Sequence, residues 1–193
     1  DRWQVAFAAE PGRRWALLIE DATEFAAALY GAWHAGKQVY LPADAQPGTL
    51  ARLGPMVDGV AGELPGGLQA PSSAGSAPRQ ALDTQASGLV LFTSGSSGEP
   101  VAIAKSLAQL QAEIDAQQAL HGQRWAATPG LQVWATVSQQ HIYGLLFAVL
   151  WPLASGSRIV TPRLAYAEQL AERLGPEPAL LVSSPAHLKR LPG

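Results

Sequence analysis

The sequence LVLFTSGSSGEPVAIA, residues 89–104, joins two apolar runs through a segment of small polar residues. The first run, Leu89–Phe92, is typical of a buried strand, and the seven residues Thr93–Glu99 contain no apolar side chain. A surface turn needs only about two to five residues. Backbone N–H groups in a glycine-rich turn can converge on an anion, and hydroxyl groups add further donors. The segment therefore indicates a phosphate-binding loop, although its composition also fits an ordinary surface loop.

Common nucleotide and nucleophile motifs do not describe this loop. No glycine lies two residues before Lys105, so the loop is not G-x-x-x-x-G-K-[ST]. It also differs from G-x-G-x-x-G and from the G-x-S-x-G nucleophile elbow. A Ser-His hydrolase using Ser96 or Ser97 with His141 is a further reading, but it has neither the elbow nor an obvious acidic partner.

The residues before the loop predict a β-α-β unit. Residues 14–19 form an apolar strand, Asp21 and Glu24 resemble a capping box, and apolar residues then recur at helical spacing up to Gly36. Residues 39–41 predict the next strand, which such a connection places parallel to the first. A weaker helix is expected after Pro47. Residues 65–88 are rich in Gly, Pro, Ser, Ala and Gln and predict a flexible connector.

The residues after the loop continue the alternation of strands and helices. Ser106 and Gln109 have the spacing of a capping box and start a helix that is expected to end near His121 and Gly122. Further strands are expected at 131–137, 157–161 and 178–183, and helices at 142–153, 164–174 and 185–191. This pattern predicts an α/β fold with parallel sheets.

Composition limits the classes of partner. The 193 residues carry a net charge of -2 and no cysteine, which gives no basic footprint for nucleic acid, no disulfide framework and no cysteine-based metal site. The chain contains no apolar stretch of about eighteen residues and no signal-peptide layout, so a cytoplasmic location without a membrane span is expected. His34, His121 and His187 lie near expected helices, and none has a second ligand at metal spacing, so no metal site is predicted in the chain. Since the chain begins at Asp1, a piece of a longer protein is expected.

The loop resembles the phosphate-binding signature of the adenylate-forming enzymes, the superfamily of acyl- and aryl-CoA synthetases, luciferases and peptide-synthetase adenylation domains. That signature reads Thr-Ser-Gly-Ser/Thr-Thr/Ser-Gly-x-Pro-Lys. The sequence matches it at Thr93, Ser94, Gly95, Ser96, Ser97 and Gly98, and again at Pro100. The segment SQQHIYGLLFAVLWPLASGSRIV, residues 138–160, is similar to the His-x-x-Gly segment of the same superfamily. The resemblance implies that His141, Tyr143 and Gly144 border the acid pocket, and that the acid has no α-amino group.

The resemblance covers the chain but only the first part of the superfamily's architecture. It implies layered parallel-sheet subdomains of a large N-terminal domain. The adenine-binding half and the C-terminal domain with the catalytic Lys are not among residues 1–193, so no catalytic residue is expected here and this fragment alone is expected to be inactive. In a full-length ligase the loop would bind ATP with Mg²⁺, and an acyl or aryl acid would pass through an acyl-adenylate to a thiol of CoA or an acyl carrier protein. The segments also resemble the divergent ligases of aryl-polyene and xanthomonadin-type pigment clusters.

One position departs from the signature. Val101 stands where the pattern has Lys, so the loop lacks its usual cation, and Lys105 is the candidate replacement. This departure leaves open a second reading, in which the protein is a degenerate nucleotide-binding relative without adenylation activity.

Overall fold

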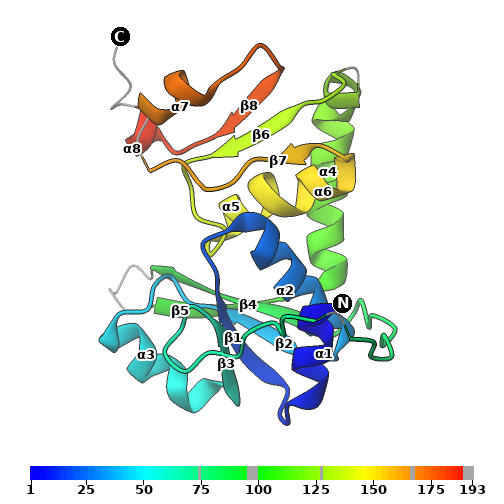
Figure 1. Ribbon diagram of the computed structural model, residues 1–193, viewed down its shortest axis with the longest axis vertical. Helices are drawn as coiled ribbons and strands as arrows, with labels where there is room; N and C mark the ends of the chain where they lie inside the picture. Colours follow the sequence, from blue (N-terminus) through cyan, green and yellow to red (C-terminus); the bar gives the residue numbers. More distant parts are fainter. Residues whose placement is uncertain (74, 95–99, 127, 166–167, 189–193) are drawn as a thin grey trace. The chain divides into compact units, whose positions relative to one another are not determined.

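The computed structural model describes residues 1–73, 75–94, 100–126, 128–165 and 168–188. The chain divides into two compact units (Figure 1). Unit 1 contains residues 1–19 and 24–110, and unit 2 contains residues 20–23 and 111–193. Each unit has its own sheet, mainly parallel in unit 1 and parallel in unit 2, which confirms the α/β prediction.

Unit 1 is built on a five-stranded sheet in the order β3-β1-β2-β4-β5. Its strands are β1 (Arg14–Leu18), β2 (Gln38–Leu41), β3 (Gly59–Gly62), β4 (Ser87–Ser94) and β5 (Pro100–Ser106). The first four strands pair in parallel, and β5 turns back antiparallel to β4. The β-α-β unit expected for residues 14–41 is therefore present, with β1 parallel to β2 and α2 (Ala22–His34) between them in the chain.

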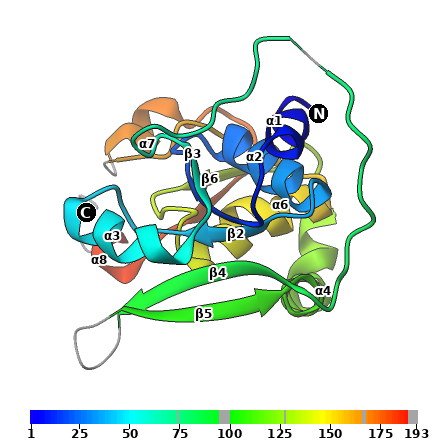
Figure 2. The same cartoon turned by 90° about the horizontal axis from the view of Figure 1, so that it is seen from below.

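Helices cover both faces of this sheet (Figure 2). On one face, α3 (Pro47–Leu53) packs with Leu53 against a cluster that includes Leu18, Tyr40 and Val90. On the other face lie α2 and α1 (Arg2–Ala9), where Phe7 makes an edge contact with Trp15 at 5.4 Å between ring centroids. Side chains of a strand alternate between faces, so β1, β2 and β4, which have consecutive buried residues, supply both layers of the core.

Two elements of unit 1 were not expected from the sequence, namely α1 and β3. Strand β3 is Gly-Val-Ala-Gly, which has low strand propensity. It forms because β1 offers it a full parallel register from Trp15 to Leu18. The short 3-10 helix η1 (Gly54–Met56) connects α3 to it.

The chain between β3 and β4 follows an extended path and, in its described part, contains no helix or strand of its own (Figure 2). It nevertheless contacts unit 1. The side chain of Gln4, 3% exposed, donates hydrogen bonds to the carbonyls of Ala77 and Pro78. Gln80 N–H donates to His34 O at 2.9 Å. These bonds anchor the second half of the segment between β3 and β4 to unit 1. The flexibility expected for residues 65–88 stays a prediction.

Helix α4 (Leu107–Ala126) begins with the predicted capping box. Ser106 N–H donates to Gln109 Oε1 at 2.9 Å, and Gln109 N–H donates to Ser106 Oγ at 3.2 Å. The helix does not end at Gly122 as expected, but continues to Ala126. Trp125 explains the extension, because its ring stacks on Trp151 at 3.4 Å between centroids.

Unit 2 is built on a three-stranded parallel sheet in the order β7-β6-β8. Its strands are β6 (Gln132–Ala135), β7 (Arg158–Ile159) and β8 (Ala179–Val182). One helical run, α5 (Ile142–Gly144), η2 (Leu145–Leu150) and α6 (Trp151–Ser155), packs on it through Ala148, which clusters with Val133 and Val182. The remaining helices are α7 (Glu168–Arg173) and α8 (Pro185–Leu188). Each strand of unit 2 is shorter than the range expected from the sequence.

The middle of the helical run, η2, is a π-helix rather than the expected α-helix. Pro152 follows it at the start of α6 and has no N–H to donate. Its ring would also crowd the carbonyl four residues earlier in a regular α-helix. The wider turn accommodates the proline, and Trp151 N–H bonds back to Leu146 O.

Candidate functional site

The Ser/Gly loop leaves the sheet of unit 1 at a defined edge. Strand β4 lies parallel to β2, with Val39 opposite Leu89 and Leu41 opposite Leu91. The carboxyl ends of β1, β2 and β4 therefore lie at the same edge, and Thr93 and Ser94 are the last residues of β4 there. Open α/β sheets bind ligands outside this edge. Gly95, Ser96, Ser97 and Gly98 lie outside the described residues.

Strand β5 returns from the loop and carries both Val101 and Lys105. Val101 lies opposite Thr93 beside the loop, and its side chain is 52% exposed. Lys105 lies opposite Leu89. Four residues of strand separate the two positions by about 13 Å. Lys105 is thus at the far end of the hairpin from the loop, a geometry that does not favour its predicted role as the phosphate cation.

The edge of the same sheet also holds an ionised carboxylate. Asp44 follows β2, and the hydrogen bond from the Thr49 side chain, then that from Gln46 N–H, lower the pKa of its carboxyl. The Gln46 bond measures 3.0 Å. Asp44 therefore contributes negative charge near the carboxyl end of β2 and starts the turn into α3.

A second group of predicted site residues lies in unit 2, on the turn between β6 and α5. His141 is the N-cap of α5, with an extended backbone, φ -106 and ψ 148, and an exposed side chain. Its N–H donates to Ser138 O at 3.3 Å, and its carbonyl accepts Leu145 N–H at 2.8 Å. Gly144 is buried against Ser138, and a Cβ at Gly144 would collide with the Ser138 carbonyl. The fold therefore brings His141, Tyr143 and Gly144 together on one tight turn, and Gly144 is required for its closure.

Gln140, next to His141, was not singled out from the sequence. Its side chain is 2% exposed, and neither its amide nitrogen nor its amide oxygen has a hydrogen-bond partner in the described part of the chain. Buried amides are normally hydrogen bonded. Gln140 is therefore a further candidate for a ligand contact on this turn.

Aromatic side chains extend from this turn along the helical run. Tyr143, 45% exposed, lies 4.9 Å from Phe147 between ring centroids, and Phe147 meets Trp151 edge-on at 5.8 Å. Trp151 stacks on Trp125 of α4. We call Tyr143, Phe147, Trp151 and Trp125 the ring cluster.

The ring cluster forms one side of a cavity of about 520 Å³ within unit 2. Leu131 and the β8 residues Leu180 and Val182 line it further, and His121 and Arg124 of α4 also line it. Its volume falls within the roughly 300–1,000 Å³ typical of small-molecule sites, which are mostly apolar with a few polar groups. The cavity can therefore hold an apolar or aromatic ligand.

A polar cluster at the carboxyl ends of β6 and β8 was also not predicted from the sequence. Thr136, 4% exposed, has its hydroxyl 2.8 Å from Ser183 Oγ and 3.3 Å from His187 Nδ1. Ser184 Oγ lies 3.1 Å from the same His187 nitrogen. The signal that could have found the hydroxyl groups is their position directly after parallel strands, whose carboxyl ends meet.

Neither a metal cluster nor a spanning helix is found in the described ranges of the chain. No group of three or more His, Asp or Glu side chains there is placed to hold a metal ion. No helix there is long and apolar enough to cross a membrane.

Comparison with known proteins decides the family. Residues 57–191, more than half of the chain, match the AMP-binding enzyme family. The chain belongs to the AMP-binding enzymes. A search of curated proteins gave no match.

Three solved structures illustrate the shared fold. An acyl-CoA synthetase from Brucella canis is 20% identical with a TM-score of 0.68, and the match covers 98% of this chain and 42% of that protein. The o-succinylbenzoate CoA synthetase of Bacillus subtilis, in complex with its acyl-adenylate intermediate, is 16% identical with a TM-score of 0.68, over 89% of this chain and 49% of that protein. A malonyl-CoA ligase with methylmalonyl-CoA and AMP bound is 24% identical with a TM-score of 0.68, and the match covers 93% of this chain and 41% of that protein. This chain thus spans less than half the length of each of these three proteins.

Proposed function

We propose that the full-length protein is an ATP-dependent ligase that activates an acyl or aryl carboxylic acid. A carboxylate oxygen of the acid attacks the α-phosphorus of ATP, and the bond to pyrophosphate breaks to give an acyl-adenylate. A thiol sulfur then attacks the acyl carbon, AMP leaves, and the thiol proton passes to solvent. The observation that carries the proposal is the Ser/Gly loop, which begins at the carboxyl end of β4 in a chain of the AMP-binding family.

The loop Thr93–Gly98 is proposed to hold the β- and γ-phosphates of ATP. Its hydroxyl and backbone N–H groups suit phosphate oxygens, and the position of Thr93 and Ser94 at the sheet edge fits that ligand. The related o-succinylbenzoate CoA synthetase has been solved with ATP and a magnesium ion. Mg²⁺ would neutralise phosphate charge, and this role matters here because Val101 supplies none.

The acid is proposed to bind in unit 2 beside His141, Tyr143 and Gly144. The adjoining cavity of about 520 Å³ and its ring cluster support an apolar or aromatic acid. An aromatic acid, with an acyl carrier protein as the thiol partner, would fit the resemblance to aryl-polyene pigment ligases. CoA is the alternative acceptor of the acyl group. CoA would offer the thiol of a small molecule, and an acyl carrier protein would offer a thiol attached to a protein.

A second candidate is a nucleotide-binding relative that makes no adenylate. The observation that favours it is the absence of a cation at Val101 together with the distance of Lys105 from the loop. Such a protein would retain the fold and bind ATP weakly.

Pyrophosphate release by the full-length protein separates these two functions. The assay uses ATP with a panel of aryl and fatty acids, with and without each acid. Release that depends on one group of acids supports the ligase. Bound ATP with a flat response across the panel would favour the nucleotide-binding relative. Residues 1–193 alone are expected to form no acyl-adenylate, and detectable product from this piece would contradict the assignment of catalysis to the rest of the chain.

A further inference from the structure

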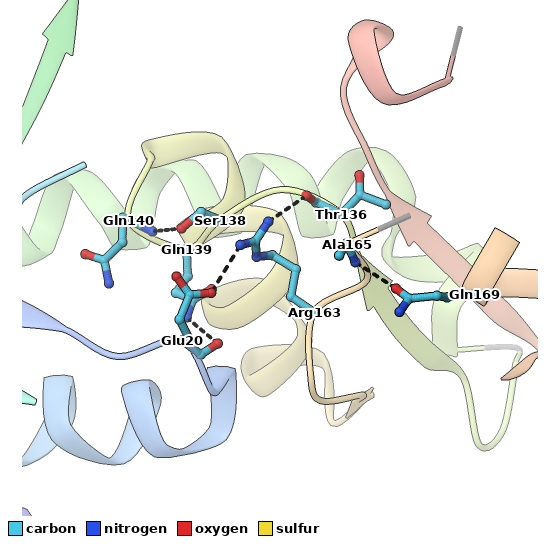
Figure 3. A network of polar contacts seen from close by, with 8 residues as sticks. All are labelled: Glu20, Thr136, Ser138, Gln139, Gln140, Arg163, Ala165 and Gln169. Carbon is cyan, nitrogen blue, oxygen red and sulfur yellow. Dashed lines mark hydrogen bonds and ion pairs between the residues drawn. The ribbon is translucent and has the colours of Figure 1, made fainter. Parts of the chain in front are cut away.

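The turn that carries His141 is held by a closed ring of hydrogen bonds in unit 2 (Figure 3). Arg163 Nη1 donates to Thr136 O at 3.2 Å, and Arg163 Nη2 donates to Glu20 Oε2 at 3.1 Å. Gln139 Nε2 donates to the backbone carbonyl of Glu20 at 3.0 Å. The ring therefore runs from Glu20 through Arg163 to Thr136, along the chain to Gln139, and back to Glu20. We call it the Arg163 ring.

The ring fixes the start of the turn from two sides. Thr136 and Gln139 are 4% and 3% exposed, so their bonds lie largely out of water. Next to the ring, Gln140 N–H donates to Ser138 Oγ at 3.2 Å, which keeps the turn tight. His141 follows directly, and its own N–H bonds to Ser138 O. A shift of residues 136–139 would consequently move His141.

Arg163 is suited to this role by the shape of its side chain. A guanidinium is a planar fork that can donate to a carbonyl and a carboxylate at the same time, and a lysine ammonium cannot reproduce that geometry. The side chain is 31% exposed, so its charged hydrogen bonds are only partly weakened by water.

We propose that Arg163, supported by Glu20, is a positioning residue for the acid-binding side of the site. This inference rests on the proposed function, since it assigns the acid to the His141 turn. Arg163 acts through Thr136 and the turn, not on the reacting atoms. Its loss should therefore weaken use of the acid and leave ATP binding at the loop of unit 1 unchanged.

The test compares Arg163→Met with Arg173→Met in the full-length protein. Arg173 is a matched control, because its guanidinium also donates to a backbone carbonyl, that of Thr161 at 3.3 Å, and packs over the Trp134 ring. For Arg163→Met we expect kcat/KM for the acid to fall about 10- to 100-fold, as for other small misplacements of reacting groups. The KM for ATP should be unchanged in both variants, and Arg163→Lys should recover only part of the loss.

A double substitution tests the link to Glu20. Glu20→Gln alone should lower kcat/KM for the acid by about two- to threefold, as for a half-exposed charged pair. Combined with Arg163→Met it should add little further, because Glu20→Gln weakens the same hydrogen bond that Arg163→Met removes. If the losses in kcat/KM for the acid were additive in the double variant, Glu20 would not act through Arg163.

Hydrogen exchange provides a readout that needs no substrate. The amides of Gln140 and His141 should exchange about tenfold faster in Arg163→Met than in wild type or Arg173→Met. Unchanged exchange would overturn the proposal, and so would faster exchange with an acid kcat/KM equal to that of Arg173→Met. If the wild-type protein activated no acid at all, the proposed function would fail, while exchange would still decide whether Arg163 holds the turn.

Discussion

Restoring a cation beside the Ser/Gly loop should strengthen ATP binding. In Val101→Lys the new side chain starts opposite Thr93, at the loop end of the hairpin, from a position that is 52% exposed. Two unit charges about 4 Å apart attract by about 1 kcal/mol in water and about 4 kcal/mol near a protein surface. Because position 101 is half exposed, we expect the new lysine to improve the free energy of ATP binding by about 1–2 kcal/mol. This gain corresponds to a roughly 5- to 30-fold lower Kd for ATP.

The assay is ATP titration of the full-length protein by calorimetry at fixed ionic strength. Ile103→Lys is the matched control, because Ile103 lies two residues further along the same face of β5 and is 39% exposed. It adds the same charge about 7 Å further from the loop. The gain should be several times larger for Val101→Lys and should shrink with added salt. Equal gains in the two variants would refute the reasoning that Val101 is the missing cation position.

The remaining predictions concern the turn, the fold of unit 1 and the ring cluster. Gly144→Ala should lower the free energy of unfolding by about 1–3 kcal/mol in urea titrations, since the new methyl group meets the Ser138 carbonyl; an unchanged midpoint would contradict this. The hydrogen bonds from Arg14 lower the pKa of Asp58, so its stabilisation is present above the ordinary carboxyl pKa and is lost as pH falls through the lowered one. Asp58→Asn should therefore destabilise the protein at neutral pH but much less in strong acid, and a deficit independent of pH would count against this. Trp125→Leu should raise the KM for aryl acids about two- to tenfold by removing a stacked ring, and an equal rise for fatty acids would argue against ring stacking.

The sequence was most informative where local rules and tertiary structure agree. The β-α-β unit of residues 14–41 follows from apolar periodicity, and the Ser106–Gln109 capping box depends only on neighbouring residues. The His-x-x-Gly segment at His141 and Gly144 was located by its motif, and the structure adds the tight turn and the physical reason for the glycine.

The rest depends on contacts between residues distant in sequence. Strand β3 has weak intrinsic propensity and needs β1 beside it. Helix α4 continues beyond Gly122 because the ring of Trp125 stacks on that of Trp151. The Arg163 ring joins residues more than a hundred positions apart, from Glu20 to Arg163, and no local pattern marks such a pair.

Acid-dependent formation of an acyl-adenylate tests the central claim most directly. The full-length protein is incubated with ATP, Mg²⁺ and each acid, without a thiol, and the product is identified by mass spectrometry. The account predicts an acyl-AMP and an equal amount of pyrophosphate for at least one apolar or aromatic acid. Intact ATP with every acid, from a folded protein that binds the nucleotide, would contradict it.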